Sequence, residues 1–327
     1  MPHLVSVVIP VFKGELTLTS LVDEIVELTG TVISPGGVPW RIAEVLLVFD
    51  NGPDQSAKVI RDLAHSHDFV RAVWLSRNFG QHSATLAGMA SSGSEWIATI
   101  DEDGQHNPAD IGTLIDSALR NYSPVVYAKP LNPPPHGPLR NAASRLAKFF
   151  ISKLSGGVAT TDYQSFRLML GEFGRSVAAY SGSGVYLDVA LGWVAPKTAT
   201  ADVTLREEGP RSSGYSPRKL VSHFWRLVLS SGTRALRIVS ALGLLFAAVG
   251  VVLAIAFTVQ RLVGGNLPAG WTSTITVILI SAGAILFSLG VIAEYLGVAV
   301  NMAMGKPPYL IVSDLRNGPL GRGKNTQ

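Results

Sequence analysis

Two long apolar segments near the C-terminal end constrain this chain more than any other feature. Residues 238–259 and 275–300 are almost free of charge, with Arg261 between them and Glu294 inside the second. As an α-helix the first segment spans about 33 Å, against a hydrocarbon core of about 30 Å, and the second is also long enough to span. We therefore expect two transmembrane helices. The alternative is a buried hydrophobic hairpin of a soluble protein.

The distribution of charge indicates how these segments would be oriented. Charged residues make up only 15% of the chain, below the roughly 25% of soluble domains, and nearly all lie before residue 238. Basic residues cluster before the first segment and after the second, whereas the connection offers only Arg261, so both flanks should be cytoplasmic. Leu4–Val11 is too short for a signal peptide. We expect a multi-pass protein of the inner (plasma) membrane.

Composition excludes several kinds of chemistry. The chain has no cysteine, which removes disulfides, thiolate nucleophiles and Cys-ligated metals. Its net charge of +4 is too small to indicate nucleic-acid binding.

The first half of the chain alternates between short apolar, β-branched runs and helical patterns. This spacing predicts an α/β fold with a Rossmann-like, mostly parallel sheet, in which ligands bind beyond the carboxyl ends of the strands. Strands are expected at Leu4–Val11, Glu44–Phe49, Val70–Leu75 and Trp96–Ile100, and helices at Leu16–Leu28, Ser56–Ala64, Ala84–Ala90 and Ile111–Arg120.

The later segments suggest how the chain is divided. The proline-rich stretch 128–138 should be neither helix nor central strand, because proline fixes φ and lacks a donor. Arg140–Lys153 is expected to be helical, and Pro217–Arg237 to form an amphipathic helix at the membrane interface. The predicted division is a cytoplasmic domain (1–215), an interface helix (216–237), two transmembrane helices (238–300) and a cytoplasmic tail (301–327).

The acidic segment Asp101–His106 carries the clearest chemical signal. Asp101 and Asp103 follow a predicted strand, and carboxylates at positions i and i+2 of an extended segment project to one side, where they can share a divalent cation. A solvated acidic turn is the alternative. For His106 we expect a role in the turn or beside the metal ligands rather than as a ligand.

An ordered set of motifs resembles the family 2 glycosyltransferases with a GT-A domain. The similarity is to the polyprenyl-phosphate glycosyltransferase group, which includes dolichol-phosphate mannose synthase and bacterial GtrB- and ArnC-type enzymes, and it covers nearly the whole chain. The matching segments are Val7–Glu15, Leu47–Asp54, Leu75–Gly80 with Ala87-Gly88, Asp101–His106, Ser165–Met169, Arg206–Tyr215, Glu294-Tyr295 and Lys306–Tyr309.

The resemblance implies a set of site residues. For the donor nucleotide it implies Pro10, Val11, Glu15, Asp50, Arg77, Asp101, Glu102 and Asp103, with Asp101 and Asp103 holding Mg²⁺ or Mn²⁺. Arg77 is as readily explained as a structural partner of a helix end. Catalytic roles are implied for Asp103, Asp162, Gln105 and Arg206. Lys129, Arg140, Arg206, Arg211 and Lys219 are expected along the route of the acceptor phosphate.

Three positions depart from the family pattern. The usual Asp-Asp-Gly-Ser is Phe49-Asp50-Asn51-Gly52 here, which removes one acidic contact and leaves the base preference open. The usual lysine after Asn-Phe-Gly is Gln81. An acidic residue often stands at the position of Ser165, which weakens the assignment of Asp162 as a base.

The function implied is the inverting, metal-dependent transfer of a hexose from a UDP- or GDP-linked donor to polyprenyl phosphate, for cell-envelope glycosylation. Besides donor and acceptor, the expected partners are the lipid bilayer and further copies of the chain, in a homo-oligomer such as a tetramer; nucleic acid is not expected. A processive polysaccharide synthase would need more membrane helices and a Gln-x-x-Arg-Trp motif. A non-enzymatic membrane scaffold or transport component would not need Asp101 and Asp103.

Overall fold

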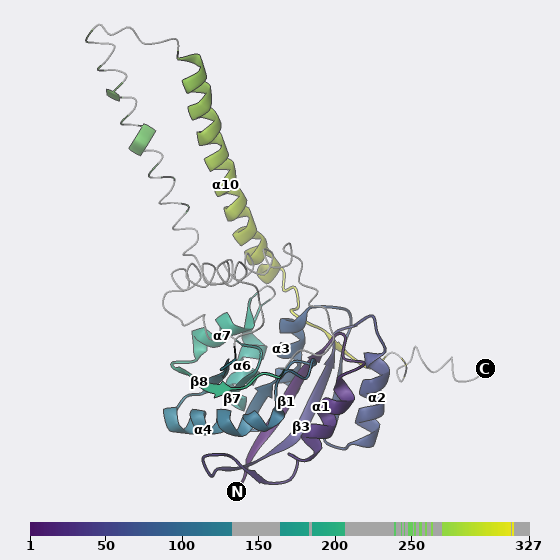
Figure 1. Ribbon diagram of the computed structural model, residues 1–327. Coiled ribbons are helices and arrows are strands. Elements are labelled where there is room, and N and C mark those ends of the chain that lie inside the picture. Colours follow the sequence, from purple (N-terminus) through teal and green to yellow (C-terminus); the bar gives the residue numbers. More distant parts are fainter. Residues whose placement is uncertain are drawn as a thin grey trace, which may run out of the picture.

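The computed structural model describes residues 1–132, 164–182, 185–206, 270–314 and 316, together with scattered positions between 239 and 263. An α/β domain carries a long helix that projects away from it (Figure 1). The expected helices at 140–153 and 217–237 and most of the first apolar segment lie outside the described residues.

The strands and helices follow the predicted alternation. The N-terminal half contains β1 (His3–Val11), α1 (Leu18–Val26), β2 (Val32–Ile33), β3 (Pro39–Phe49), α2 (Ser56–Ser66), β4 (Val70–Leu75), α3 (Gln81–Ser91), β5 (Trp96–Thr99), the short 3₁₀ helix η1 (Pro108–Asp110) and α4 (Ile111–Asn121). The chain continues with β6 (Val125–Pro130), β7 (Arg167–Leu170), α6 (Gly171–Tyr180), α7 (Leu187–Val194), β8 (Thr198–Val203), α10 (Trp271–Ala303) and β9 (Ile311–Val312).

The strands form one mostly parallel sheet in the order β8-β6-β7-β5-β1-β3-β4-β9, with β2 paired to β3. The central strands β5, β1, β3 and β4 are parallel, whereas β7 and β9 run antiparallel to their neighbours. The predicted sheet is therefore confirmed, and its central strands all end at the same edge.

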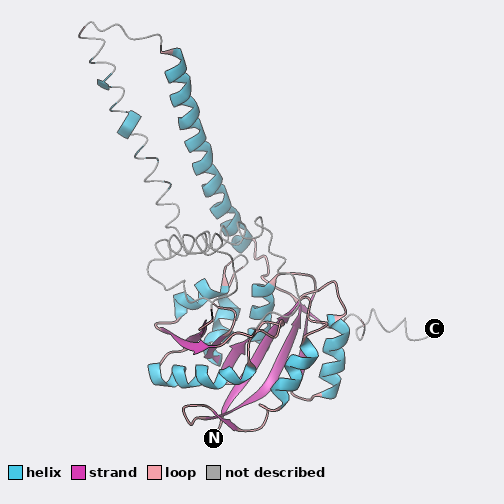
Figure 2. Ribbon diagram, in the orientation of Figure 1, coloured by secondary structure: helices cyan, strands magenta, loops and turns pink. Residues whose placement is uncertain are grey.

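Two helical layers cover the sheet because its central strands are apolar on both faces. Along β1, Val5, Val7 and Ile9 point into a core built with α1, α2 and α4, while Val8 points into a second core with α3, α6 and α7. Figure 2 shows the strands lying between the two groups of helices. This rigid scaffold fixes the loops that follow the central strands.

The proline-rich stretch is partly in the sheet, which corrects the sequence expectation. β6 extends to Pro130 and pairs with β8 over its whole length. Its pairing with β7 covers only Val125–Tyr127, so Ala128–Pro130 have a strand partner on one side. Pro130 is the last residue of the strand, where the missing N–H group interrupts no ladder.

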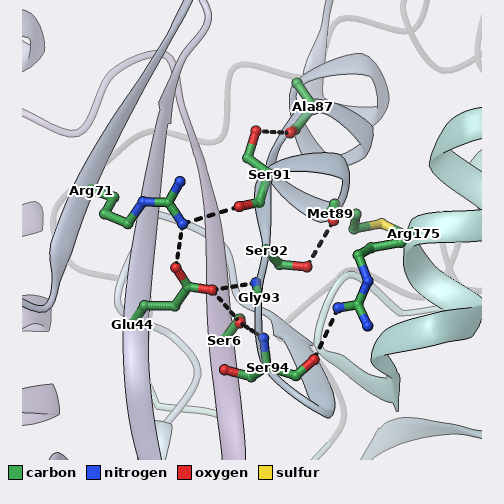
Figure 3. Close-up of polar contacts among 10 residues, drawn as sticks. All are labelled: Ser6, Glu44, Arg71, Ala87, Met89, Ser91, Ser92, Gly93, Ser94 and Arg175. Atoms are coloured by element: carbon green, nitrogen blue, oxygen red, sulfur yellow. Dashed lines mark hydrogen bonds and ion pairs between the residues drawn. The ribbon is translucent and has the colours of Figure 1, made fainter.

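A polar network pins the strands at the amino end of the sheet, opposite the ends where ligands are expected (Figure 3). The Glu44 carboxylate accepts hydrogen bonds from Ser6 Oγ at 2.7 Å and from the Gly93 amide at 2.6 Å. Its second oxygen pairs with Arg71 at 2.5 Å, and Ser6 Oγ accepts from the Ser94 amide. Glu44 thus joins β1, β3, β4 and the turn before β5.

The second apolar segment forms α10, as predicted. Within it, Ile280–Ala303 is long and apolar enough to cross a membrane, and most of its side chains are exposed in the monomer. After α10 the chain returns to the α/β domain, where β9 pairs with the edge strand β4. Ile311 and Val312, which lie within the expected cytoplasmic tail (301–327), therefore contribute to the sheet.

Candidate active site

The loops after the central strands bring the predicted site residues to one edge of the sheet. Pro10 and Val11 end β1, Asp50 follows β3, Arg77 comes after β4, and Asp101 follows β5. The Asp50 amide donates to the carbonyl of Val11 at 2.8 Å, which joins the first two loops directly. This arrangement is the one expected for a ligand site in a doubly wound sheet.

Asp101 is held by two neutral donors. Gln81, the first residue of α3, donates its side-chain amide to Oδ1 at 2.6 Å, and the Ser165 hydroxyl donates to Oδ2 at 2.5 Å. Withdrawal from water raises the pKa of Asp101, while the Ser165 bond and the nearby His106 and Arg167 charges act in the opposite direction. The hydrogen bonds from Gln81 and Ser165 fix the orientation of the Asp101 carboxylate.

Asp103 shapes the turn that follows. Its Oδ1 accepts the Gln105 amide at 3.0 Å, and Gly104 adopts a positive φ of 74° between them. The Gln105 carbonyl accepts the Arg206 amide at 2.9 Å. Hydrogen bonds therefore connect three of the residues expected in catalysis, Asp103, Gln105 and Arg206.

The pair Asp101 and Asp103 fits a divalent cation that a substrate would help to hold. Within the part of the chain that the structure describes, no group of three or more carboxylate or imidazole side chains forms a complete metal site. Mg²⁺ commonly takes one or two protein carboxylates and completes its shell with phosphate oxygens and water. Two carboxylates at a strand end match that requirement.

Glu102 and Glu15 make structural contacts at the predicted donor site. The Glu102 carboxylate accepts the backbone amides of Phe12 and Lys13, each at 2.9 Å, and so anchors the loop after β1. Glu15 accepts the Gln55 amide at 3.1 Å and links the same loop to the start of α2. Both residues shape the wall of the site.

Asp50 folds the loop after β4. Only 3% of Asp50 is exposed, and its two oxygens accept the amides of Phe79 at 2.7 Å and Gly80 at 2.8 Å. Burial raises the pKa of Asp50, and these two hydrogen bonds oppose that shift. Arg77 lies over the Phe79 ring at 4.0 Å, and its positive charge also acts to lower the pKa of Asp50.

The turn after β3 has no room for a side chain at Gly52. A Cβ there would lie 1.6 Å from the carbonyl oxygen of Phe12. Asn51 adopts a left-handed conformation with φ of 51°, and its side-chain amide donates to the Leu75 carbonyl at 2.5 Å. The Asn-Gly pair that departs from the family motif therefore binds the ends of β1, β3 and β4 together.

A buried ion pair lies next to the segment that carries Ser165. Arg167 of β7 and Asp188 of α7 form a salt bridge with side chains 4% and 6% exposed. The Thr99 hydroxyl donates to the Ser165 carbonyl at 2.5 Å, and Arg167 Nε lies 3.2 Å from Thr99 Oγ1. The pair thus stabilises the segment that carries Ser165 toward Asp101.

His106 is also buried and packs on Phe166 with ring centres 5.0 Å apart.

Arg206 forms a salt bridge with Glu24 of α1. Its guanidinium lies 2.8 Å from Glu24, and it lines a cleft of about 460 Å³. The other residues around this cleft are Asp23, Glu24, Glu27, Leu28, Asn107, Pro108 and Ala109. Lys129 is exposed near the end of β6. Asp162, Arg140, Arg211 and Lys219 lie outside the described residues.

Sequence reasoning missed the roles of Gln81 and Ser165 as donors to Asp101. The feature of the sequence that could have indicated these roles is that Gln81 and Ser165 both depart from the family pattern described above. The bidentate contact between Arg61 and Asp314, at 2.5 and 2.9 Å, could not be predicted from local sequence patterns, because the two residues are 253 positions apart.

Comparisons with known proteins identify the family to which the chain is similar and known structures that share its fold. The family model described as glycosyl transferase family 2 matches residues 6–173. The chain is 30% identical to the undecaprenyl-phosphate 4-deoxy-4-formamido-L-arabinose transferase of Pseudomonas fluorescens SBW25, over 97% of this chain and 91% of that protein. The protein of the same name from Proteus mirabilis is 28% identical over 94% and 92%.

Among solved structures, a similar one is the glucosyl-3-phosphoglycerate synthase of Mycobacterium tuberculosis in complex with Mn²⁺, uridine diphosphate and phosphoglyceric acid. It aligns with a TM-score of 0.50 and 16% identity over 71% of this chain and 78% of that chain. At this identity the likeness shows a shared fold.

Proposed function

Because this chain belongs to glycosyl transferase family 2 and is therefore a glycosyltransferase, we propose that it transfers a sugar from a nucleotide-diphosphate donor to polyprenyl phosphate. One observation carries the choice of acceptor. The similarity to the undecaprenyl-phosphate transferases is not confined to residues 6–173 but covers 97% of the chain, including α10 and β9.

We propose that the donor is a UDP- or GDP-linked hexose. The nucleotide would lie against the loops after β1, β3 and β4, bordered by Pro10, Val11, Glu15, Asp50 and Arg77. In support, Asp50 organises the loop that presents Arg77, an exposed cation at this edge of the sheet. The diphosphate would extend toward Asp101 and Asp103, with Glu102 holding the adjoining loop.

Asp101 and Asp103 would hold Mg²⁺ or Mn²⁺. Such a cation, when bound, neutralises charge that develops on the leaving diphosphate. Gln81 and Ser165 keep the Asp101 carboxylate oriented before the donor arrives. A preorganised ligand costs no reorientation when the donor binds.

The reaction would be a direct displacement. An oxygen of the acceptor phosphate forms the bond to the anomeric carbon as the bond to the nucleotide diphosphate breaks, which inverts that carbon. The second pKa of a phosphate monoester is about 6, so the attacking group is mostly ionised at neutral pH and a general base matters less than for a hydroxyl acceptor. Asp162 remains the candidate for a base or for a group that orients Arg167, and Gln105 would lie near the sugar.

Cationic side chains would guide the acceptor phosphate to the site. We assign this route to Lys129, Arg140, Arg206, Arg211 and Lys219. Arg206 pairs with Glu24, and both side chains are about 40% exposed. An exposed pair of this kind contributes less than about 1 kcal/mol, so a doubly charged phosphate can replace it.

The membrane arrangement is part of the same proposal. We place residues 1–215 in the cytoplasm at the inner membrane, 216–237 at the interface, 238–300 across the bilayer as two helices, and 301–327 in the cytoplasm, in a homo-oligomer such as a tetramer. A cysteine introduced at Asn266 should react with an impermeant reagent in intact cells. Reaction of a cysteine at Gln327 instead would contradict this orientation.

The proposal is tested by incubating membranes with radiolabelled UDP- and GDP-sugars and added undecaprenyl phosphate. One donor should transfer its label to an organic-soluble product only when the lipid phosphate is present. A high-molecular-weight polymer would favour a processive synthase. No transfer from any donor in the panel to the lipid phosphate would refute the proposed reaction.

A further inference from the structure

The segment Tyr309–Asp314, here called the C-terminal clamp, binds the edge of the sheet beside the candidate site. Its strand β9 pairs with the last residues of β4, Ile311 opposite Leu75 and Val312 opposite Trp74. Asp314 accepts two hydrogen bonds from Arg61 of α2, at 2.5 and 2.9 Å, and its side chain is only 8% exposed. A bidentate contact of this kind fixes geometry as well as charge.

The clamp contacts the start of the donor loop, which we define as Ser76–Gly80. The Ser76 amide donates to the carbonyl of Leu310 at 3.0 Å. At the other end of the same loop, the amides of Phe79 and Gly80 bind Asp50. The clamp therefore holds the first residue of the donor loop, and Asp50 holds its last two residues.

A second route passes through aromatic side chains. The Arg61 guanidinium lies 4.9 Å from the centre of the Trp74 ring, and Trp74 contacts Phe49 edge-on with ring centres 5.4 Å apart. Phe49 directly precedes Asp50. The Arg61–Asp314 pair is therefore connected through the Trp74 ring to the residue next to Asp50.

The clamp begins shortly after the long apolar helix. α10 ends at Ala303, and only residues 304–308 separate it from Tyr309, which packs against the core on the α3 side of the sheet. The helix, the clamp and the donor loop are thus connected by a short continuous path.

We propose that the C-terminal clamp is a positioning element for donor binding. Asp314 and Arg61 act through Ser76 and Trp74 and do not touch the donor; they hold the donor loop in the conformation in which Arg77 faces a nucleotide diphosphate. The inference deepens the proposed function and rests on its placement of the donor.

The test compares Asp314→Asn with Glu44→Gln in the full-length protein in detergent. Each change turns an acid into its amide and breaks an arginine pair that includes a 2.5 Å contact, but Glu44 lies at the opposite end of the strands. Hydrogen exchange is measured without ligand, and calorimetry is done with Mn²⁺ plus UDP and with Mn²⁺ plus GDP. Arg61→Lys, which keeps the charge but loses the fork, serves as a milder second variant.

In Asp314→Asn we expect faster exchange across Ser76–Gly80 and about tenfold weaker binding of the diphosphate that the wild type binds, with Arg61→Lys changing both in the same direction. Glu44→Gln should speed exchange at Gly93 and Ser94 and leave nucleotide affinity unchanged. Unchanged affinity in Asp314→Asn and Arg61→Lys, beside a wild type that binds, would overturn the clamp proposal alone. A wild type that binds neither diphosphate would overturn the proposed donor site itself.

Discussion

Ser165 donates its hydroxyl to the Oδ2 atom of Asp101 at 2.5 Å, although the two residues are 64 positions apart in the chain. The antiparallel pairing of β5 with β7 brings them together, since Thr99 lies opposite Arg167 in that ladder. A neutral hydroxyl therefore holds the proposed metal ligand.

The first prediction concerns this contact. Ser165→Ala should leave the fold intact but raise the metal concentration needed for transfer by about 10-fold or more, because losing a group that orients a metal ligand typically weakens affinity 10–100-fold. The check is the Mn²⁺ dependence of transfer. Ser91→Ala, which removes a hydroxyl that caps the end of α3 away from the site, is the control. An unchanged metal requirement in Ser165→Ala would contradict the assigned role.

The sequence predicted the central sheet and the place of the carboxylates because both depend on strong local patterns. The strand at Val70–Leu75 has the predicted bounds, and Asp101 follows a strand as expected. Helix starts were less exact: α3 begins at Gln81 rather than Ala84, directly after Gly80 with its φ of 93°.

Contacts between distant residues could not be predicted in the same way. β9 contains only Ile311 and Val312, too short to show a period of two. Glu102 was expected to face the donor, but the charge pattern cannot show that its carboxylate accepts the Phe12 and Lys13 amides. Such contacts depend on which loops the completed sheet brings together.

The second prediction concerns the buried pair of Arg167 and Asp188. Asp188→Asn leaves a buried arginine without its counter-charge, so it should lower the free energy of unfolding by about 3–5 kcal/mol. Replacing both residues by apolar side chains, in Arg167→Met with Asp188→Leu, should destabilise less. Denaturant unfolding of the purified proteins measures both. A double variant less stable than Asp188→Asn would show that the buried charge is not the cause.

The third prediction concerns the turn at Gly52. Gly52→Ala must displace backbone, because its Cβ would lie 1.6 Å from the Phe12 oxygen. We expect a loss of stability of about 1–3 kcal/mol and weaker donor binding, since the turn joins three strand ends. Gly30→Ala, where no atom lies within 4 Å of the added Cβ, is the matched control and should change stability by less than about 0.5 kcal/mol. Equal effects of the two changes would argue against the close approach.

The fourth prediction is a pH dependence of stability. Burial raises the pKa of Glu44, but the hydrogen bonds from Ser6, Gly93 and Arg71 outweigh it, so the folded-state pKa lies below the ordinary value of 4.5. Glu44 therefore contributes stability that is present above that value and lost as the pH falls through the lowered pKa. The melting temperatures of wild type and Glu44→Gln should differ at about pH 6 and converge toward about pH 3. A constant difference would contradict the ionic role of Glu44.

The central claim is tested most directly by transfer to polyprenyl phosphate in the purified protein, with Asp103→Ala as the comparison. With the donor found in the membrane panel, the wild type should form a polyprenyl-phosphate sugar, detected by mass spectrometry. A chelator should abolish the product and added Mn²⁺ should restore it. Asp103→Ala should form none while keeping the wild-type melting temperature within a few degrees, since about 1 kcal/mol shifts it by that much. Full product formation in excess chelator, or by Asp103→Ala, would contradict the account.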